Sequence, residues 1–310
     1  MTADPRYDIL FESVKIGPVT APNRFYQVPH CTGMGYNRPN SVAAMREIKA
    51  EGGWGVVCTE YCSIHPSSDD APLPSHSLWD DKDVRSHAKI VEKVHHHGAL
   101  AGVELWHGGR STANLYSRED SLGPTSFPCE HNHPVQNRVM DKRDINNLRR
   151  WHVDAAKRAK SAGFDIVYLY ATHGFMIGQF LHPSNQRSDE YGGSLENRVR
   201  LLREMIEETK EAIGDSCAVA VRFSADSGSY DEDPDNEENR AILEMLAEMP
   251  DLWDINARNY EIEIGSSRYV KEGALEAYVR WVKQVTKKPV VSTGRFTTPD
   301  TMVRQVREGV

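Results

Sequence analysis

Reactive side chains recur at one kind of place along the chain, where a short apolar run ends. One such run ends in His30 and Cys31, another contains Glu104, and a third contains Arg222. A thiol, an imidazole, a carboxylate and a guanidinium can serve as nucleophile, base, hydrogen-bond acceptor and cation. A protein with a purely structural role does not need this combination of reactive side chains. The complete set of polar residues and glycine at the run ends is His30, Cys31, Glu60, Tyr61, Glu104, His107, Tyr170, His173, Arg222, Asn256, Arg258, Tyr260, Gly294 and Arg295.

The elements that must position these residues alternate between strand and helix patterns. Residues 144–162 carry apolar side chains three and four apart and stop at Gly163, and residues 194–213 open with Ser194 and stop at a glycine. Strands that alternate with helices predict a parallel sheet. The seven runs interpreted as strands are RFYQVP, GVVCTEYC, LAGVELWH, DIVYLYA, AVAVRFS, LWDINA and PVVSTG.

Two parallel architectures compete for this pattern. A doubly wound sheet should show GxGxxG after its first strand, and the chain has only CTGMG there. We therefore favour a (β/α)8 TIM barrel of the α/β class, occupying residues 1–310 as one domain. The seventh strand precedes VREGV at the end of the sequence, and a barrel closes only with an eighth. We expect a barrel truncated within or just after its seventh β/α unit, as part of a longer chain.

In a barrel, side chains at the carboxyl ends of the strands carry the chemistry. Glu104 and Arg222 then lie at adjacent heights inside it, and buried charges must be paired or bonded, so we expect a polar ligand between them. Cys31 by itself has two interpretations, a small buried hydrophobe or a reactive thiol.

Composition narrows the possible partners and compartment. The chain has 310 residues, a formal charge of −8 and a pI near 5.9, with no basic stripe, so a nucleic-acid partner is not expected. It shows no secretion signal and no run of about 18 apolar residues, so we expect a cytoplasmic protein without a membrane segment. Five scattered cysteines indicate reduced thiols. Cys58 and Cys62 share one predicted strand without a second pair, so no metal site is expected.

Two segments resemble the old yellow enzyme family of FMN-dependent barrels. They are QFLHPSNQRSDEYGGSLENRVR at residues 179–200 and VELWHGGR at residues 103–110. The resemblance is closer still to the trimethylamine dehydrogenase branch of that family and covers essentially the whole chain. It is carried by NRFYQVPHCTGMG, KAEGGWGVVCTEYCSI, HGALAGVELWHGG, GFDIVYLYATHG and KQVTKKPVVSTGR.

The resemblance implies a bound FMN and roles for particular residues. Cys31 is implied to bond covalently to C6 of the flavin. Glu104 is implied to accept a hydrogen bond from the pyrimidine edge, and Arg222 to lie near N1 and O2, where a cation stabilises reduced flavin. The other flavin contacts that it implies are Val28, Pro29 and His30 along the ring and Gly294 and Arg295 at the phosphate.

The residues after the fourth run separate two chemistries within this family. Ene reductases usually carry a histidine, a second histidine or an asparagine three residues later, and a tyrosine two beyond that, which donates a proton. Here the positions read Tyr170, His173 and Phe175, and phenylalanine has no proton to give. Tyr170 with His173 resembles the amine dehydrogenases instead. This implies oxidation of a neutral N-methyl amine with release of formaldehyde, and Tyr61 corresponds to an aromatic residue that holds a methylated ammonium.

The resemblance departs after the sixth run. The branch has a tryptophan and an aspartate there, whereas this chain reads NARNYEIEIGSSRY, with Glu261 or Glu263 as substitutes for the aspartate and with Arg258 and Arg268 newly at hand. We therefore expect a larger secondary or tertiary amine, such as an N-methyl amino acid whose carboxylate meets Arg258.

A longer chain is implied to carry a 4Fe-4S cluster and a second nucleotide beyond residue 310, and to pass electrons to an electron-transfer flavoprotein. A homodimer is a further expectation. Ene or dienoyl reduction and an inactive fragment remain the alternatives to amine oxidation.

Overall fold

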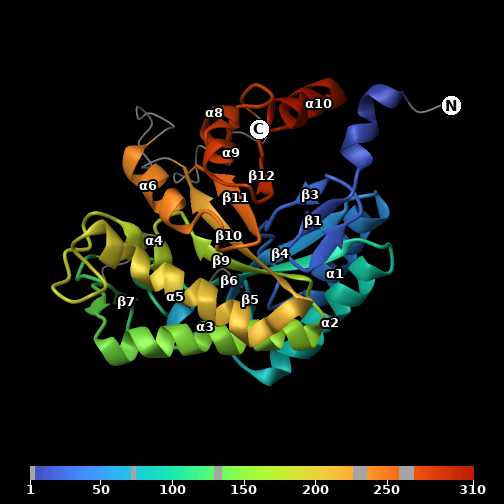
Figure 1. Cartoon of the computed structure of the whole chain (residues 1–310). Coiled ribbons are helices and arrows are strands. Elements are labelled where there is room, and N and C mark those ends of the chain that lie inside the picture. The colour runs from blue at the N-terminus through green and yellow to red at the C-terminus, as the bar shows by residue number, and fades with distance from the viewer. Residues whose placement is uncertain (1–3, 71–74, 129–134, 226–235, 258–268) are drawn as a thin grey trace.

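A computed structural model describes residues 4–70, 75–128, 135–225, 236–257 and 269–310. Its centre is a curved sheet of parallel strands with helices on the outside (Figure 1). The seven predicted strands are confirmed, and they follow one another around a nearly closed barrel of the TIM type. In hydrogen-bonded order they are β3 (Tyr26–Gln27), β4 (Val56–Ser63), β6 (Leu100–Trp106), β9 (Ile166–Ala171), β10 (Ala218–Ser224), β11 (Leu252–Asn256) and β12 (Val290–Val291).

The helices lie between successive strands, as the alternating pattern predicts. Both helices that the sequence delimits are confirmed: α3 starts at the reciprocal cap of Asp141 and Asp144 and ends at Gly163 (φ 95°), and α5 is capped by Ser194. The helices are α1 (Pro39–Glu51), α2 (Asp81–His95), α3 (Lys142–Ala162), α4 (Met176–Leu181), α5 (Leu195–Ile213), α6 (Glu237–Leu246), α8 (Glu276–Arg280), α9 (Val282–Val285) and α10 (Pro299–Glu308).

Short elements close the amino end of the barrel and shape the loops. An antiparallel hairpin places Ile16 and Ala21 against the inward side chains of the barrel strands, so it covers the amino end of the barrel interior. The short strands are β1 (Val14–Ile16), β2 (Val19–Ala21), β5 (His76–Ser77), β7 (Leu122–Gly123) and β8 (Arg138–Val139), and the 3-10 turns are η1 (Pro5–Phe11), η2 (Pro66–Ser68), η3 (Gly109–Ser111) and η4 (Gly214–Ser216).

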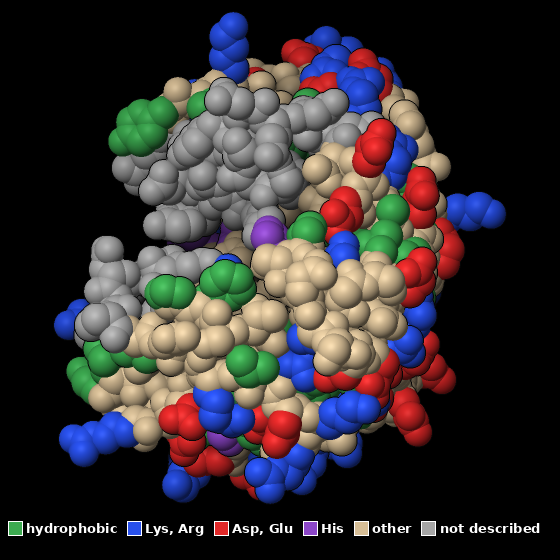
Figure 2. Space-filling view, turned by 90° about the vertical axis from the view of Figure 1, so that its left-hand side faces the viewer, with side chains coloured by type: hydrophobic (Ala, Val, Ile, Leu, Met, Phe, Trp, Pro, Cys, Tyr) green, Lys and Arg blue, Asp and Glu red, His purple; other side chains and the backbone are tan. Residues whose placement is uncertain are grey.

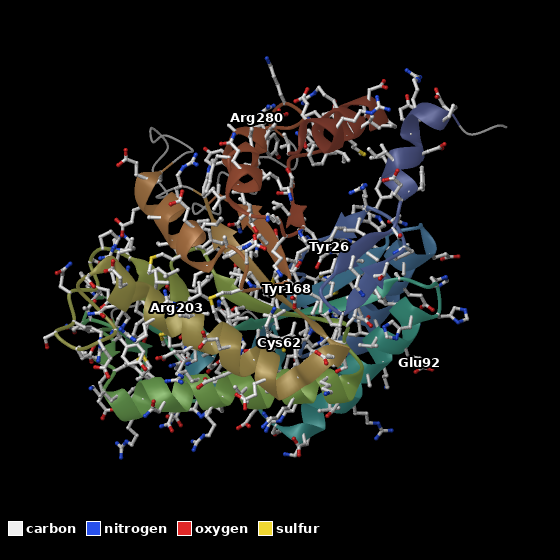
Figure 3. The ribbon with its side chains drawn as sticks, viewed as in Figure 1. Tyr26, Cys62, Glu92, Tyr168, Arg203 and Arg280 are labelled. Carbon is white, nitrogen blue, oxygen red and sulfur yellow. The ribbon has the colours of Figure 1, made fainter. Side chains whose placement is uncertain are left out.

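Side chains alternate between two apolar cores, as the pleat of a strand requires. Odd positions of β9 and β10, such as Val167 and Val219, pack outward against the helices, while even positions such as Ile166 and Ala220 fill the barrel. Halfway up the barrel, the hydroxyl of Tyr168 donates a hydrogen bond to the hydroxyl of Tyr26 at 2.5 Å (Figure 3). The interior is thus packed, not a pore.

Strand β4 breaks this alternation with a bulge. Its pairing with β6 shifts register between Cys58 and Tyr61. Before the bulge, Cys58 packs inside the barrel, whereas after it Cys62 packs in the outer core, 3.6 Å from Nε2 of His87. A bulge reverses the faces of the residues that follow it. Tyr61 is therefore turned toward the barrel mouth.

The cysteines described are Cys31, Cys58, Cys62 and Cys217, and all four are free thiols. Cys129 lies outside the described residues. None of the helices in the described ranges has the length and apolar character needed to cross a membrane.

The tyrosine pair inside the barrel gives a test of the interior packing. Tyr168→Phe should lower the free energy of unfolding by about 1–2 kcal/mol, because the Tyr26 hydroxyl loses its hydrogen bond in a buried place. The Sγ of Cys58 lies 3.8 Å from the Tyr26 hydroxyl, but a thiol is too weak a hydrogen-bonding group to replace the lost bond. Urea denaturation measures the change. Tyr269→Phe, at a residue that is 84% exposed, is the matched control and should leave stability unchanged.

Candidate functional site

A layer of polar side chains caps the apolar interior of the barrel at its carboxyl end. Glu104, Tyr170, Arg222 and Asn256 occupy inward positions of four adjacent strands and are all buried. The Nη1 atom of Arg222 lies 3.7 Å from Oε1 of Glu104 and donates a hydrogen bond to the carbonyl of Pro29 at 3.0 Å. The side-chain amide of Asn256, oriented to satisfy its neighbours, accepts from Nε of Arg222 at 2.9 Å. One cation therefore joins the strands to the loop that follows β3.

That loop carries Cys31 at the rim of the barrel. The amide of His30 donates to the carbonyl of Thr59 at 3.1 Å, and the amide of Thr32 donates to Glu60 at 2.7 Å. Cys31 itself is exposed between these anchored neighbours. Partial removal of the thiol from water, together with the negative charge of Glu60, raises the pKa of Cys31.

A row of aromatic rings extends from the end of β4 to the end of β9. The ring centroids of Tyr61 and Trp106 are 4.7 Å apart, those of Trp106 and Phe175 are 5.2 Å apart, and those of Phe175 and Tyr170 are 5.3 Å apart. Within the described residues, the buried Nε1 of Trp106 has no hydrogen-bond partner. We call Tyr61, Trp106, Phe175 and Tyr170 the aromatic row.

Each end of the aromatic row carries a polar contact. At one end, the Tyr61 hydroxyl donates to the carboxylate of Asp70, whose burial raises its pKa to about 6. At the other end, the Tyr170 hydroxyl lies 2.6 Å from Nδ1 of His173. The Asn256 amide lies 3.4 Å from Nε2 of the same imidazole. The imidazole is therefore oriented from two sides.

His173 also has an unusual backbone. Its φ is 54°, in the left-handed region that side chains other than glycine rarely adopt, and Gly174 follows with φ 71°. Such a conformation costs about 1–3 kcal/mol and persists where the surroundings hold it. The turn that it makes returns the imidazole toward Tyr170.

A cavity of about 270 Å³ opens beside His173, between the ends of β9 and β10, α4 and the start of α6. Figure 2 looks onto this side of the molecule, where the surface is hollowed and histidine atoms show in the hollow. The residues that line this cavity of about 270 Å³ include Thr172, His173, Leu181, Ser224 and Asn239. The volume is at the low end for a small-molecule pocket.

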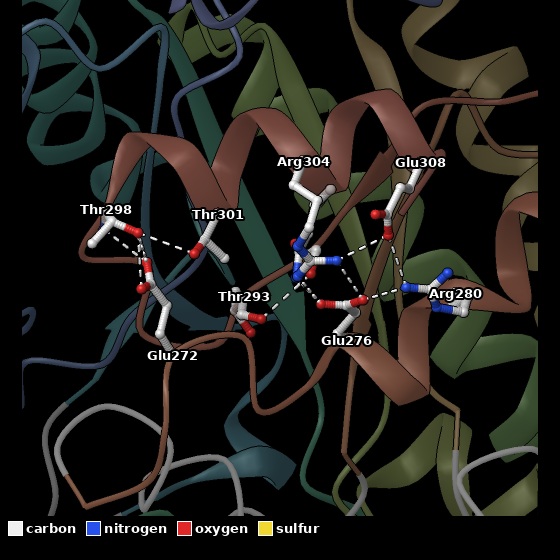
Figure 4. Close-up of polar contacts among 10 residues, drawn as sticks. Glu272, Glu276, Arg280, Thr293, Thr298, Thr301, Arg304 and Glu308 are labelled. Carbon is white, nitrogen blue, oxygen red and sulfur yellow. Dashed lines mark hydrogen bonds and ion pairs between the residues drawn. The ribbon is translucent and has the colours of Figure 1, made fainter.

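Gly294 and Arg295 lie in the loop after β12. The φ of Gly294 is 138°, and a side chain there would meet the backbone of Ala274 and Leu275 at 3.3–3.4 Å, so only glycine fits. Arg295 is exposed and donates to the carbonyl of Val270 at 2.6 Å. Two sets of contacts hold this loop (Figure 4): Glu276 of α8 pairs with Arg304 of α10, and Glu272, which precedes α8, accepts a hydrogen bond from the amide of Thr298 at the start of α10.

The structure brings together most of the residues predicted from the sequence. The Tyr170–His173 pair meets the polar layer through Asn256, and the loop of Val28, Pro29 and His30 meets it through Arg222. Arg295 points its guanidinium at a carbonyl outside this group, and Arg258 lies outside the described residues. Three further residues, Trp106, Asp70 and Arg46, were not predicted from the sequence to belong to the site.

Two of these missed residues left some signal in the sequence. Trp106 stands between two residues that were identified, Glu104 and His107. Arg46 lies four residues from Val42 and from Ala50 on the buried face of α1. No sequence signal marks Asp70, because an irregular loop has no periodic pattern.

The residues present fit an FMN. A flavin ring needs acceptors and donors along its pyrimidine edge, and Glu104 and Arg222 supply one of each at the top of the interior. The buried Nε1 of Trp106 is a further donor whose acceptor is not provided by the described residues. Glu104, Arg222 and the loop of Val28–Cys31 would hold the ring.

Known proteins resemble this chain in sequence and in fold. The sequence model of the NADH:flavin oxidoreductase / NADH oxidase family matches residues 9–310. Dimethylamine dehydrogenase of Hyphomicrobium sp. (strain x) is 39% identical over 321 residues, which cover 100% of this chain and 44% of that protein.

Two solved structures are also similar. Histamine dehydrogenase from Rhizobium sp. 4-9 matches with a TM-score of 0.94 and 50% identity, over 98% of this chain and 45% of that one. 6-Hydroxypseudooxynicotine amine oxidase from Pseudomonas geniculata N1 matches with a TM-score of 0.93 and 50% identity, over 99% and 46%. The chain thus spans less than half the length of these relatives.

The buried pair gives a test of the polar layer. Glu104→Gln should lower the free energy of unfolding of flavin-free protein by on the order of 3 kcal/mol, because the buried Arg222 loses the charge of the carboxylate that lies 3.7 Å away. Chemical denaturation measures this, with the exposed Glu244→Gln as the control for loss of one charge. Equal stability of the two variants would show that the pair contributes nothing.

Proposed function

Because the chain belongs to the NADH:flavin oxidoreductase / NADH oxidase family, we propose that it oxidises a secondary or tertiary methylated amine with FMN and removes the methyl group. The observation that carries this proposal is the hydrogen bond between Tyr170 and His173, with Phe175 stacked on Tyr170. The similarity to dimethylamine and histamine dehydrogenases supports it.

In this proposal the chain holds the flavin at its pyrimidine edge, at its ring and at its phosphate. Glu104 and Arg222 would bind the pyrimidine edge, and Gly294 and Arg295 would bind the phosphate. Cys31 would form a thioether with the ring, in which the S–C bond replaces the thiol S–H and a ring C–H, and the two electrons released would leave through the flavin to dioxygen or to the external electron acceptor. When bound, FMN would accept one hydride equivalent, that is two electrons and one proton, from the N-methyl carbon, and water would then release formaldehyde from the iminium product.

The chain's own residues prepare the amine. An amine gives up a hydride equivalent only when its nitrogen lone pair is free, so the ammonium form must lose a proton. The Tyr170 oxygen can accept that proton while its own is held on Nδ1 of His173, at 2.6 Å. Asn256 lies on the other side of the imidazole and orients it. His173 and Tyr170 thus act as one proton-accepting pair.

The aromatic row forms the substrate side of the site. The faces of Tyr61 and Phe175 attract a methylated ammonium through their ring quadrupoles. Arg258 would bind a carboxylate, which favours an N-methyl amino acid as the substrate. A 4Fe-4S cluster, an electron-transfer flavoprotein as acceptor, a homodimer and a cytoplasmic location stay predictions.

Ene or dienoyl reduction is the second candidate, and an inactive fragment is the third. The family includes NADH oxidase of Thermoanaerobacter brockii, which is 31% identical. Phe175 disfavours reduction, because its ring, set against Trp106 and Tyr170, occupies the place from which a tyrosine would donate a proton.

The covalent flavin is tested by acid precipitation. The wild-type protein should retain a yellow chromophore on the polypeptide after washing, and Cys31→Ala should release all of it, because only a covalent bond survives unfolding. The control Cys217→Ala removes a buried thiol far along the chain and should keep the colour. Retention in Cys31→Ala would show that another residue carries the bond.

The reaction is tested by anaerobic bleaching of the flavin. N-methyl amino acids and other methylated amines should bleach it, and enones should not reoxidise the reduced protein. Tyr170→Phe should slow bleaching by about 100-fold, the usual contribution of a positioned base, whereas the exposed Tyr269→Phe should not. Faster turnover of trimethylamine than of N-methyl amino acids would contradict the role of Arg258, and reoxidation by enones would favour the second candidate.

A further inference from the structure

Glu60 is a buried carboxylate that the reaction above does not use. It lies in the bulge of β4, and its side chain is 0% exposed. One carboxylate oxygen, Oε2, accepts hydrogen bonds from both the amide and the hydroxyl of Thr32, each at 2.7 Å. Thr32 directly follows Cys31. The carboxylate therefore grips the backbone next to the thiol.

The other carboxylate oxygen is not neutralised by its neighbour. Oε1 of Glu60 lies 3.5 Å from Nδ1 of His76, but burial lowers the pKa of that histidine to about 4, so its ring is uncharged near pH 7. Oε1 has no hydrogen-bond partner within the described part of the chain. Gly35 leaves room for this arrangement, because a side chain there would lie 2.7 Å from the His76 amide and would overlap the carboxylate.

Arg46 holds the same loop from the opposite side. This fully buried arginine of α1 donates from Nη2 to the carbonyl of His30 at 2.5 Å and from Nη1 to Oε1 of Gln27 at 3.3 Å. The residue before Cys31 is thus bound to a cation and the residue after it to an anion. A side chain flanked by two fixed neighbours loses little further freedom when it reacts.

We propose that Glu60 is a positioning residue for Cys31: its carboxylate fixes the loop that presents the thiol and brings a negative charge close to it. The proposal rests on the proposed covalent role of Cys31 for its purpose, but the effect of Glu60 on the thiol does not depend on flavin.

The charges around the thiol come from several elements. The Glu60 carboxylate opposes formation of the thiolate, whereas the Arg46 guanidinium favours it. Buried arginine stays charged, so neutralising Glu60 removes a negative charge from the surroundings of the thiol and leaves the positive charge of Arg46. The other titratable or charged groups that act on Cys31, His30 or Glu60 are Tyr61, Asp70, His76, His87, Lys49 and Arg222.

The first test measures the thiol itself. Protein produced under riboflavin limitation is treated with iodoacetamide at a series of pH values, and alkylation of the Cys31 peptide is followed by mass spectrometry. Glu60→Gln keeps an oxygen for Thr32 but removes the charge. It should alkylate at least about threefold faster at pH 7, with the pH profile displaced downward, because the thiolate is the reactive form.

The control is Glu92→Gln, which removes the same charge from an exposed position on α2 (Figure 3) and should follow the wild-type profile. An unchanged profile in Glu60→Gln would overturn the electrostatic part of the proposal.

The second test measures positioning. Thr32→Val removes one of the two bonds to Glu60 with little change in shape, and Glu60→Ala removes both. The proportion of acid-stable flavin should fall from wild type to Thr32→Val and further in Glu60→Ala, while Glu60→Gln retains it. Equal proportions in all four proteins would overturn the positioning role. If wild type holds no acid-stable flavin, the covalent proposal fails, and the alkylation profile still tests Glu60.

Discussion

The inside of the barrel excludes water, and this constraint governs everything at its mouth. An ion in such a place costs several kcal/mol of lost hydration, which is recovered only when the geometry provides partners. Arg222 has them in Glu104, the Pro29 carbonyl and Asn256. These partners come from two other strands and from the loop after β3. Burial of one cation therefore sets the relative position of the polar layer and of the segment that carries Cys31.

The bulge in β4 is the second device that shapes the site. Without it, strict alternation would put Cys62 inside the barrel beside Cys58 and would turn Tyr61 outward. With it, Cys62 joins the outer core, Tyr61 faces Trp106, and Glu60 lies under the loop of Thr32. One extra residue in a strand thus supplies both the end of the aromatic row and the anchor of the thiol loop.

The aromatic row and the paired imidazole explain how one fold serves different reactions. The barrel is shared with histamine dehydrogenase and with an old yellow enzyme homologue, so the fold does not select the substrate. We expect selection to depend on the side chains at the mouth of the barrel. Phe175 contributes a surface and no proton, whereas Tyr170 and His173, 2.6 Å apart, contribute a site where a proton can be held.

The sequence by itself determined the strands, the main helices and their caps, and the polar residues at the strand ends. These follow from periodicity and from capping residues such as Gly163 and Ser194, which act within a few residues of the chain. Only the tertiary structure decided which of those residues meet. Strand register and loop paths determine the contact of Glu60 with Thr32 and the contact of Tyr61 with Asp70. They also determine which residues of β4 face into the barrel and which face outward. Those are settled by packing between segments far apart in the chain, which no local pattern records.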